Sequence, residues 1–109
     1  MPELLLSSIQ QSFHLKKVLF SLHARKEMRE EQFGIIFLHE VFEIIENGKI
    51  IEQYPDDTPF PSCLIFGKTN LDRPLHVVCA YNRFTEETVV VTLYHPDPLL
   101  WIDYERRKI

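Results

Sequence analysis

The sequence predicts one α+β domain, in which two helices pack on one face of a four- to five-stranded antiparallel sheet and an extra helix precedes them. Three observations favour this fold class: helical periodicity in the first half, extended periodicity in the second half, and short polar segments between consecutive strands. The chain has 109 residues, which suits one domain and is enough to bury a hydrophobic core. We therefore expect residues 1–109 to fold as a single unit.

The first half is predicted to be mainly helical. Residues 3–12 carry apolar side chains at four-residue spacing, which is typical of an amphipathic helix, and residues 17–21 favour a short strand. Ser21 suits the N-cap of a polar helix over residues 22–32, because its hydroxyl can accept a hydrogen bond from an orphan backbone N–H. Gly34 is expected to end that helix.

A second main helix is predicted over residues 37–46. Its apolar residues recur at i, i+3, i+4 and i+7 and form a core-facing stripe of Leu38, Val41, Phe42 and Ile45. Asn47-Gly48 is expected to stop this helix with left-handed backbone.

The second half is predicted to form four consecutive strands, over residues 49–54, 63–68, 75–81 and 88–95. A loop with three prolines follows the first of them and excludes a central strand there. The other joins are short and polar, which favours an antiparallel meander. Residues 99–107 are expected to form one last short helix.

Side-chain alternation predicts that one sheet face is core and the other carries a polar patch. The apolar rows are expected to cover the helices; they are Leu75, Val77, Cys79 and Tyr81 in one strand and Val89, Val91 and Leu93 in the next. The opposite face is then expected to bring His76 together with Thr92 and Tyr94 on adjacent strands.

The most informative candidate site combines His76, Tyr94 and Arg73. A histidine and a tyrosine on neighbouring strands can exchange protons, and a nearby arginine can hold a phosphate or carboxylate with two hydrogen bonds. An ordinary exposed cross-strand pair beside a solvated arginine explains the same three residues.

A second candidate site lies at the start of the helix over residues 22–32. His23, Arg25 and Arg29 could bind an anion near the helix N-terminus, where the backbone dipole favours negative charge. A solvated helix face with arginines paired to nearby glutamates is the competing interpretation.

Composition limits the other classes of function. The net charge of −4 counts against broad non-specific binding of nucleic acid, and no apolar run is long enough for a transmembrane helix. Cys63 and Cys79 are too few for a disulfide framework, so we expect a cytoplasmic protein with core thiols. No spacing of cysteine and histidine supports a metal site, and no cofactor is expected. Asp56 and Asp57 could act as an acid and a base, bind a cation, or simply belong to a turn.

Several motifs resemble a bacterial and archaeal family of domains of unknown function. The shared stretches are Ser21-Leu22-His23-Ala24, Asn47-Gly48, Ile50-Ile51-Glu52-x-Tyr54-Pro55, Pro61-Ser62-Cys63-Leu64, Arg73-Pro74-Leu75-His76-Val77-Val78 and Thr92-x-Tyr94-x-Pro96-Asp97-Pro98-x-x-Trp101. This family is similar to the RelE-like and MqsR-like toxins, whose order of strand, two helices and antiparallel sheet is the order predicted here.

The resemblance implies a toxin-like endoribonuclease that cleaves mRNA without metal and is neutralised by a YgiT-type zinc-finger antitoxin. In that function His23 or His76 would be the acid or base, Tyr94 would orient it, and Arg73 would stabilise the phosphate charge. RNA or the ribosome would be the target. The alternative is a non-catalytic protein-interaction module, which could form a homodimer and which binds no membrane.

Overall fold

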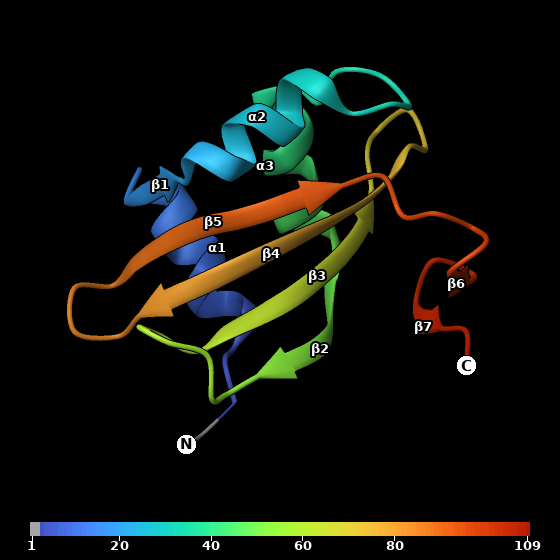
Figure 1. Cartoon of the computed structure of the whole chain (residues 1–109). Helices are drawn as coiled ribbons and strands as arrows, with labels where there is room; N and C mark the ends of the chain where they lie inside the picture. Colours follow the sequence, from blue (N-terminus) through green and yellow to red (C-terminus); the bar gives the residue numbers. More distant parts are fainter. Residues whose placement is uncertain (1–2) are drawn as a thin grey trace.

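The computed structural model describes residues 3–109 as two layers, with helices covering one face of a twisted sheet (Figure 1). In chain order, the elements are α1 Leu6–His14, β1 Val18–Phe20, α2 Leu22–Glu30, α3 Leu38–Asn47, β2 Lys49–Tyr54, β3 Ser62–Lys68, β4 Pro74–Asn82, β5 Glu87–Tyr94, β6 Trp101–Ile102 and β7 Arg106–Arg107. The predicted α+β class and the N-terminal helix are confirmed. Within the described residues, no helix is long and apolar enough to cross a membrane.

The large sheet has the strand order β1-β5-β4-β3-β2. Strands β2 to β5 form the predicted antiparallel meander. Strand β1 instead pairs parallel with β5, with Val18 opposite Thr88, so the sheet is not wholly antiparallel. This pairing is parallel because the chain leaves β1 through α2 and α3 and returns to it only after the meander, which is the crossover that parallel neighbours need.

The hydrophobic core lies between the helices and one face of the sheet. The sheet contributes Cys63, Ile65, Leu75, Val77, Cys79, Val90 and Leu93, and the helices contribute Ile9, Phe13, Ala24, Val41, Ile44 and Ile45. The row predicted for the strand over residues 75–81 therefore packs against the helices, with Tyr81 at its half-buried end.

The row predicted for the last strand is wrong over part of its length. A bulge between the Val78 and Cys79 pairings makes Val78 pair with Thr92 and Cys79 with Val90, which leaves Val91 unpaired. The extra residue shifts the alternation, so Thr88, Val90 and Leu93 are buried while Val91 is 37% exposed.

The two main helices differ from the prediction in detail. The hydroxyl of Ser21 does accept a hydrogen bond from the Ala24 amide at 2.9 Å, as expected of an N-cap. The buried stripe of α3, however, is Val41, Ile44 and Ile45, whereas Leu38 and Phe42 are about half exposed. Compared with the predicted orientation, α3 is turned about its own axis where it packs against β3. The nearly buried Glu40 therefore also faces inward.

Gly48 ends α3 for a reason other than the predicted one. Its φ is −88°, which is not left-handed. A Cβ atom at this position would lie 2.4 Å from the carbonyl oxygen of Ile44 and 2.6 Å from that of Phe66. The close approach of α3 to β3, rather than a positive φ, therefore requires glycine here.

The tail over residues 99–107 is a β-hairpin, not the predicted helix. Strands β6 and β7 pair Trp101 with Arg107 and Ile102 with Arg106. Asp103 and Tyr104 both have positive φ, and Glu105 donates a backbone hydrogen bond to Ile102, which closes the turn. We name residues 101–107 the C-terminal hairpin; it lies beyond the end of the large sheet in Figure 1.

Candidate functional site

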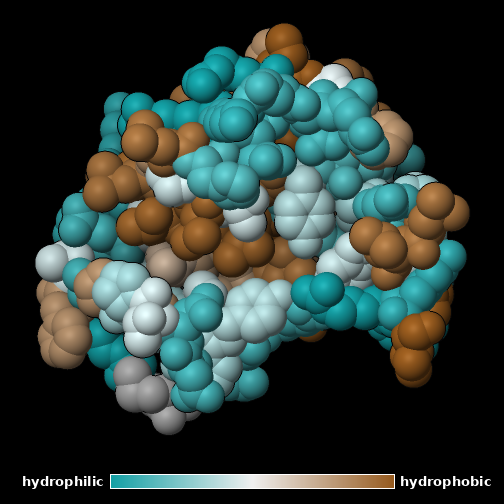
Figure 2. Space-filling view, viewed as in Figure 1, coloured by the Kyte–Doolittle hydropathy of each residue, from teal (hydrophilic) through white to brown (hydrophobic). Residues whose placement is uncertain are grey.

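The sheet face opposite the helices gathers most of the polar chemistry of the sheet, and we name it the front face. Strand register and alternation place these side chains on it: Glu52, Tyr54, Ser62, Leu64, Phe66, His76, Val78, Ala80, Thr92 and Tyr94. Figure 2 views this face, where apolar and aromatic residues fill the middle and hydrophilic ones surround them.

His76 occupies the centre of one end of the front face and is completely buried. Its Nε2 lies 2.6 Å from the backbone carbonyl oxygen of Tyr104, and its Nδ1 lies 3.2 Å from the hydroxyl of Tyr94. Because a carbonyl only accepts hydrogen bonds, Nε2 carries the proton and Nδ1 accepts from Tyr94. Burial lowers the pKa of His76, although the hydrogen bond to Tyr104 opposes the shift, and the ring is neutral at pH 7.

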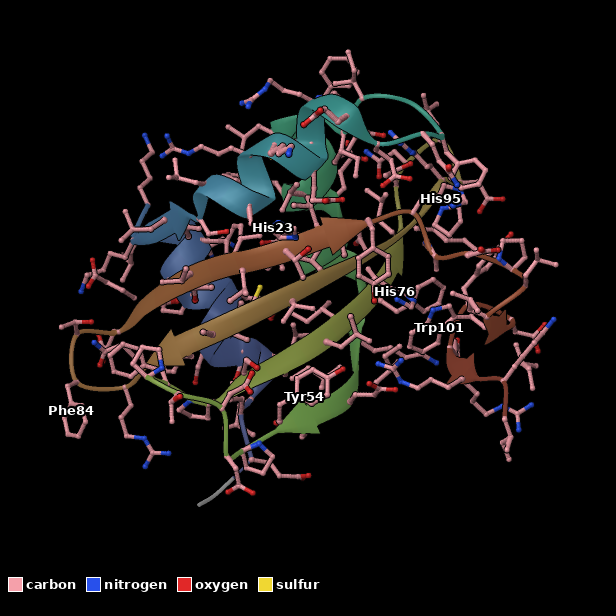
Figure 3. The ribbon with its side chains drawn as sticks, in the orientation of Figure 1. His23, Tyr54, His76, Phe84, His95 and Trp101 are labelled. Atoms are coloured by element: carbon pink, nitrogen blue, oxygen red, sulfur yellow. The ribbon has the colours of Figure 1, made fainter. Side chains whose placement is uncertain are left out.

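Aromatic rings enclose His76. The indole of Trp101 meets the imidazole edge-on with ring centroids 4.5 Å apart, and Phe66 does so at 5.7 Å. Trp101 is itself only 5% exposed. Figure 3 shows Trp101 beside His76, so the C-terminal hairpin brings its largest side chain directly onto the histidine.

An ion pair joins the front face to the same hairpin. The guanidinium of Arg107 donates to both carboxylate oxygens of Glu52, at 2.9 Å and 3.0 Å. The hydroxyl of Tyr54 also donates to Glu52. Arg107 lies over the ring of Trp101, 4.7 Å from its centroid, in cation–π geometry.

These contacts shift the pKa values of the groups involved. Burial would raise the pKa of Glu52, but the hydrogen bonds from Arg107 and Tyr54 outweigh it and hold this pKa below its ordinary value. Burial and the hydrogen bond to Glu52 raise the pKa of Tyr54 to about 12. Burial also raises the pKa of Tyr94. The face therefore holds an ionised carboxylate, two protonated phenols and a neutral histidine, a clustering of shifted pKa values that is typical of functional sites.

Arg73 does not join this cluster, although we expected it on the same face as His76 and Tyr94. Its guanidinium donates to Glu40 at 3.0 Å and to the carbonyl oxygens of Gly34 and Ile35. Arg73 precedes β4 in a turn, so strand alternation does not fix the direction of its side chain, and the nearly buried carboxylate of Glu40 draws it to the helix side.

The candidates on α2 are also separate from His76. His23 is largely exposed and lies 3.7 Å from Glu27 on the same helix. Arg25 and Arg29 are exposed one turn apart. They remain predicted phosphate contacts, and no hydrogen bond or ion pair between described residues links them to Tyr94 or His76.

The proline-containing loop covers the other end of the front face. A cavity of about 310 Å³ lies there, lined by Ser21, Asp57, Thr58, Pro59, Phe60, Ser62, Ala80, Val89 and Val91. Asp57 accepts a hydrogen bond from Ser62 at 2.5 Å. This carboxylate therefore holds the loop against β3, as the turn interpretation of Asp56 and Asp57 expects for a structural aspartate.

The cysteines are core residues on the helix side of the sheet. Cys63 and Cys79 are unbonded cross-strand neighbours. Burial raises the pKa of the Cys63 thiol to about 12, and it raises that of Cys79 as well. Across residues 3–109, no three His, Cys, Asp or Glu side chains gather in a way that would hold a metal ion.

The sequence pattern does not indicate roles for Glu52, Tyr54 and Arg107. The stretches that carry the family resemblance include Glu52, Tyr54 and Trp101. Membership in these stretches is the only feature of the sequence that could have pointed to a functional role for the three residues. Arg107 had no such feature, because its partner Glu52 lies 55 residues earlier in the chain.

Comparison with known proteins gives a family and no further relative. No curated protein and no solved structure shows a significant similarity to this chain. A family model described as "domain of unknown function (DUF4258)" matches residues 20–95. That range runs from the end of β1 to just after β5 and includes α2, α3 and the whole meander. The chain therefore belongs to the DUF4258 family.

Proposed function

We propose that the chain is a metal-independent endoribonuclease, similar to the RNA-cleaving toxins of toxin–antitoxin pairs, and that the front face is its active site. The observation that carries this proposal is the presence of an ionised Glu52 and a neutral His76 on the same sheet face. Cleavage of RNA without metal needs such a pair, one group to remove a proton and one to supply it. The resemblance to RelE-like and MqsR-like toxins supports the same activity.

The proposed reaction uses the 2′-hydroxyl of RNA as the nucleophile. Glu52 takes the proton of the 2′-hydroxyl while the oxygen attacks the neighbouring phosphorus. The bond from phosphorus to the 5′-oxygen breaks, and the Nε2–H of the neutral His76 passes its proton to this leaving oxygen while Nδ1 takes the hydroxyl proton of Tyr94, so that no imidazolate forms. The protonated Glu52 then returns its proton through solvent to the Tyr94 phenolate, which restores both groups. The products are a 2′,3′-cyclic phosphate and a free 5′-hydroxyl. Tyr94 holds the imidazole through Nδ1, as the 3.2 Å contact indicates, and Arg25 and Arg29 are the proposed contacts to the RNA backbone.

Cleavage of labelled single-stranded RNA in the presence of EDTA tests the proposal. We expect products with 2′,3′-cyclic phosphate ends, and we expect Glu52→Gln and His76→Gln to slow cleavage by about 10²-fold or more. Glu30→Gln, at an exposed position on α2, is the matched control and should cleave normally. The proposal is wrong if RNA is cut neither by the wild-type chain nor by a variant whose C-terminal hairpin no longer contacts the front face.

The second candidate is a non-catalytic protein-interaction module. The observation in its favour is that His76 is fully buried with both ring nitrogens hydrogen-bonded, as in a structural histidine. Exposed apolar side chains also gather around the α2–α3 loop and α3: Phe33, Ile35, Phe37, Leu38 and Phe42.

A YgiT-type zinc-finger protein or a second copy of the chain would be the partner of such a module. This function predicts that Leu38→Asp weakens binding, measured by titration calorimetry or by the mass of the complex in solution. His76→Gln should leave binding unchanged. Loss of binding in His76→Gln alone, with the fold intact, would count against the module.

A further inference from the structure

The C-terminal hairpin contacts the reactive groups of the proposed site. The carbonyl oxygen of Tyr104 accepts the Nε2 hydrogen of His76, which is the proton that catalysis would require. Arg107 occupies both oxygens of Glu52, and the ring of Trp101 seals the imidazole from solvent. While these contacts persist, neither the base nor the acid can reach a substrate.

The hairpin also presents chemistry that resembles that of a ligand. An oxygen atom accepts from His76, where an RNA oxygen would have to lie to receive the same proton. A flat aromatic ring stands against the site, where a base of single-stranded RNA could stack. The hairpin and a strand of RNA would therefore compete for the same position on the front face.

The core between the helices and the sheet does not depend on the hairpin. The core cluster between helices and sheet contains no residue from positions 96–109. The family match ends at residue 95, before the hairpin begins. All five strands of the large sheet lie before Trp101 in the chain. Release of the hairpin would leave the core cluster intact.

The hairpin is held by the buried ring of Trp101 and otherwise by contacts of modest strength. Its two strands are two residues long, and a hairpin of this size has little stability of its own. Its turn places two non-glycine residues, Asp103 and Tyr104, at positive φ. The ion pairs Glu52–Arg107 and Lys49–Glu105 both include an exposed cation, 62% and 59% accessible, which limits their strength. The first pair is the stronger of the two, because Arg107 contacts both carboxylate oxygens. Segments of this kind open at low free-energy cost.

We infer that the C-terminal hairpin is an autoinhibitory cover over the end of the front face that holds His76, and that single-stranded RNA displaces it. The inference rests on the proposed function, because it assigns the regulation of that site. In this inference Arg107 is the residue that keeps the hairpin closed. Its guanidinium neutralises Glu52 in the closed state and must leave before the carboxylate can act as a base.

The full-length variant Arg107→Glu tests this inference, because it places a carboxylate against Glu52 and removes the cation over Trp101. Arg106→Glu is the matched control, since Arg106 lies in the same strand, is exposed, and makes no ion pair among residues 3–109. Trp101 is the sole tryptophan of the chain, so acrylamide quenching of its fluorescence reports the position of the hairpin directly.

Arg107→Glu is expected to increase the quenching of Trp101 and to increase affinity for a fluorescein-labelled, uncleavable 2′-O-methyl RNA by about tenfold. The rate of RNA cleavage should rise by about the same factor, and Arg106→Glu should match the wild type in all three measurements. The charge swap Glu52→Arg with Arg107→Glu should protect Trp101 again. Addition of the uncleavable RNA to the wild type should itself expose Trp101.

The outcomes separate the inference from the proposed function. If the uncleavable RNA binds and exposes Trp101 but no variant cleaves RNA, the cover stands and the ribonuclease proposal fails. If wild type and Arg107→Glu bind and cleave RNA equally while Trp101 is exposed only in the variant, the ribonuclease stands and the cover is wrong. Should Trp101 stay protected even when Glu105→Lys is added to Arg107→Glu, the inference is overturned.

Discussion

Arg73 is paired with Glu40, 3.0 Å from guanidinium nitrogen to carboxylate oxygen, on the helix side of the sheet and away from the histidine it was expected to assist. The guanidinium also donates to the carbonyl oxygens of Gly34 and Ile35, which fixes the loop between α2 and α3. Both side chains of the pair are mostly buried, at 18% and 11% exposure. The arginine therefore stabilises the fold.

We predict that Arg73→Ala lowers the free energy of unfolding by about 2–3 kcal/mol, because it leaves the Glu40 carboxylate nearly buried without its partner. Urea denaturation measures this. Lys68→Ala breaks an exposed pair with Asp72 at 3.7 Å and should change stability by less than about 0.5 kcal/mol. A loss of RNA cleavage in Arg73→Ala at unchanged stability would instead return Arg73 to a catalytic role.

The buried neutral His76 makes stability depend on pH. Its pKa in the folded chain is lowered from the ordinary value of 6.5, so the unfolded chain takes up a proton first as the pH falls. The stabilisation is fully present above pH 6.5 and is lost as the pH falls toward the folded-state pKa. Wild type should therefore lose more unfolding free energy than His76→Gln between pH 7.5 and 5, by at most about 1.4 kcal/mol per pH unit. Equal losses in the two chains would show that His76 does not titrate differently on unfolding.

Gly48 should be the least replaceable of the glycines at helix ends. Gly48→Ala drives a Cβ atom to within 2.6 Å of two backbone oxygens, so α3 and β3 must separate, at a cost of about 3 kcal/mol or more. Gly34 has φ +112°, but a Cβ atom there would meet only the Arg73 guanidinium, at 3.9 Å, which is an ordinary contact, so Gly34→Ala should cost only about 1–2 kcal/mol. Melting temperatures of the two variants compare these costs, and a lower value for Gly34→Ala would contradict the packing argument.

Cys63 and Cys79 should be unreactive in the folded chain. Burial raises both pKa values, to about 12 for Cys63, so almost no thiolate is present at pH 8. Ellman's reagent should therefore detect no thiol in native buffer and both thiols in urea. Rapid reaction of either thiol in native buffer would mean that β3 and β4 open more readily than their burial implies.

Sequence patterns predicted the elements whose bounds and facing depend on residues close by in the chain. The strand over residues 49–54 has the predicted bounds, because the helix stop at Asn47-Gly48 and the proline-rich loop after Tyr54 are both visible in the sequence. The pairing of His76 with Tyr94 followed from counting alternate residues along two neighbouring strands, and the register confirms it. Their assigned catalytic roles remain predictions.

The differences arise where a tertiary contact decides between two equally apolar patterns. The bulge in β5 inserts one residue into a run of three valines, and a count of period two cannot detect it. In α3, Leu38 and Phe42 are as apolar as Ile44 and Ile45, and only the approach to β3 selects which pair is buried. The tail has too few residues for either period to be distinguished, and its contacts to His76 on β4 and Glu52 on β2 hold it as a hairpin.

The parallel edge of the sheet has a consequence for the order in which the chain can assemble. The hydroxyl of Ser21 donates to the carbonyl of Val91, 70 residues later, and that of Ser12 meets Thr88 after 76 residues. A ribosome releases the N-terminal residues first, so α1 and β1 must wait without their partner until β5 has emerged. The meander can pair as it is made, because each strand follows its neighbour. Pairing of β1 with β5 is thus the last step in forming the large sheet of the nascent chain.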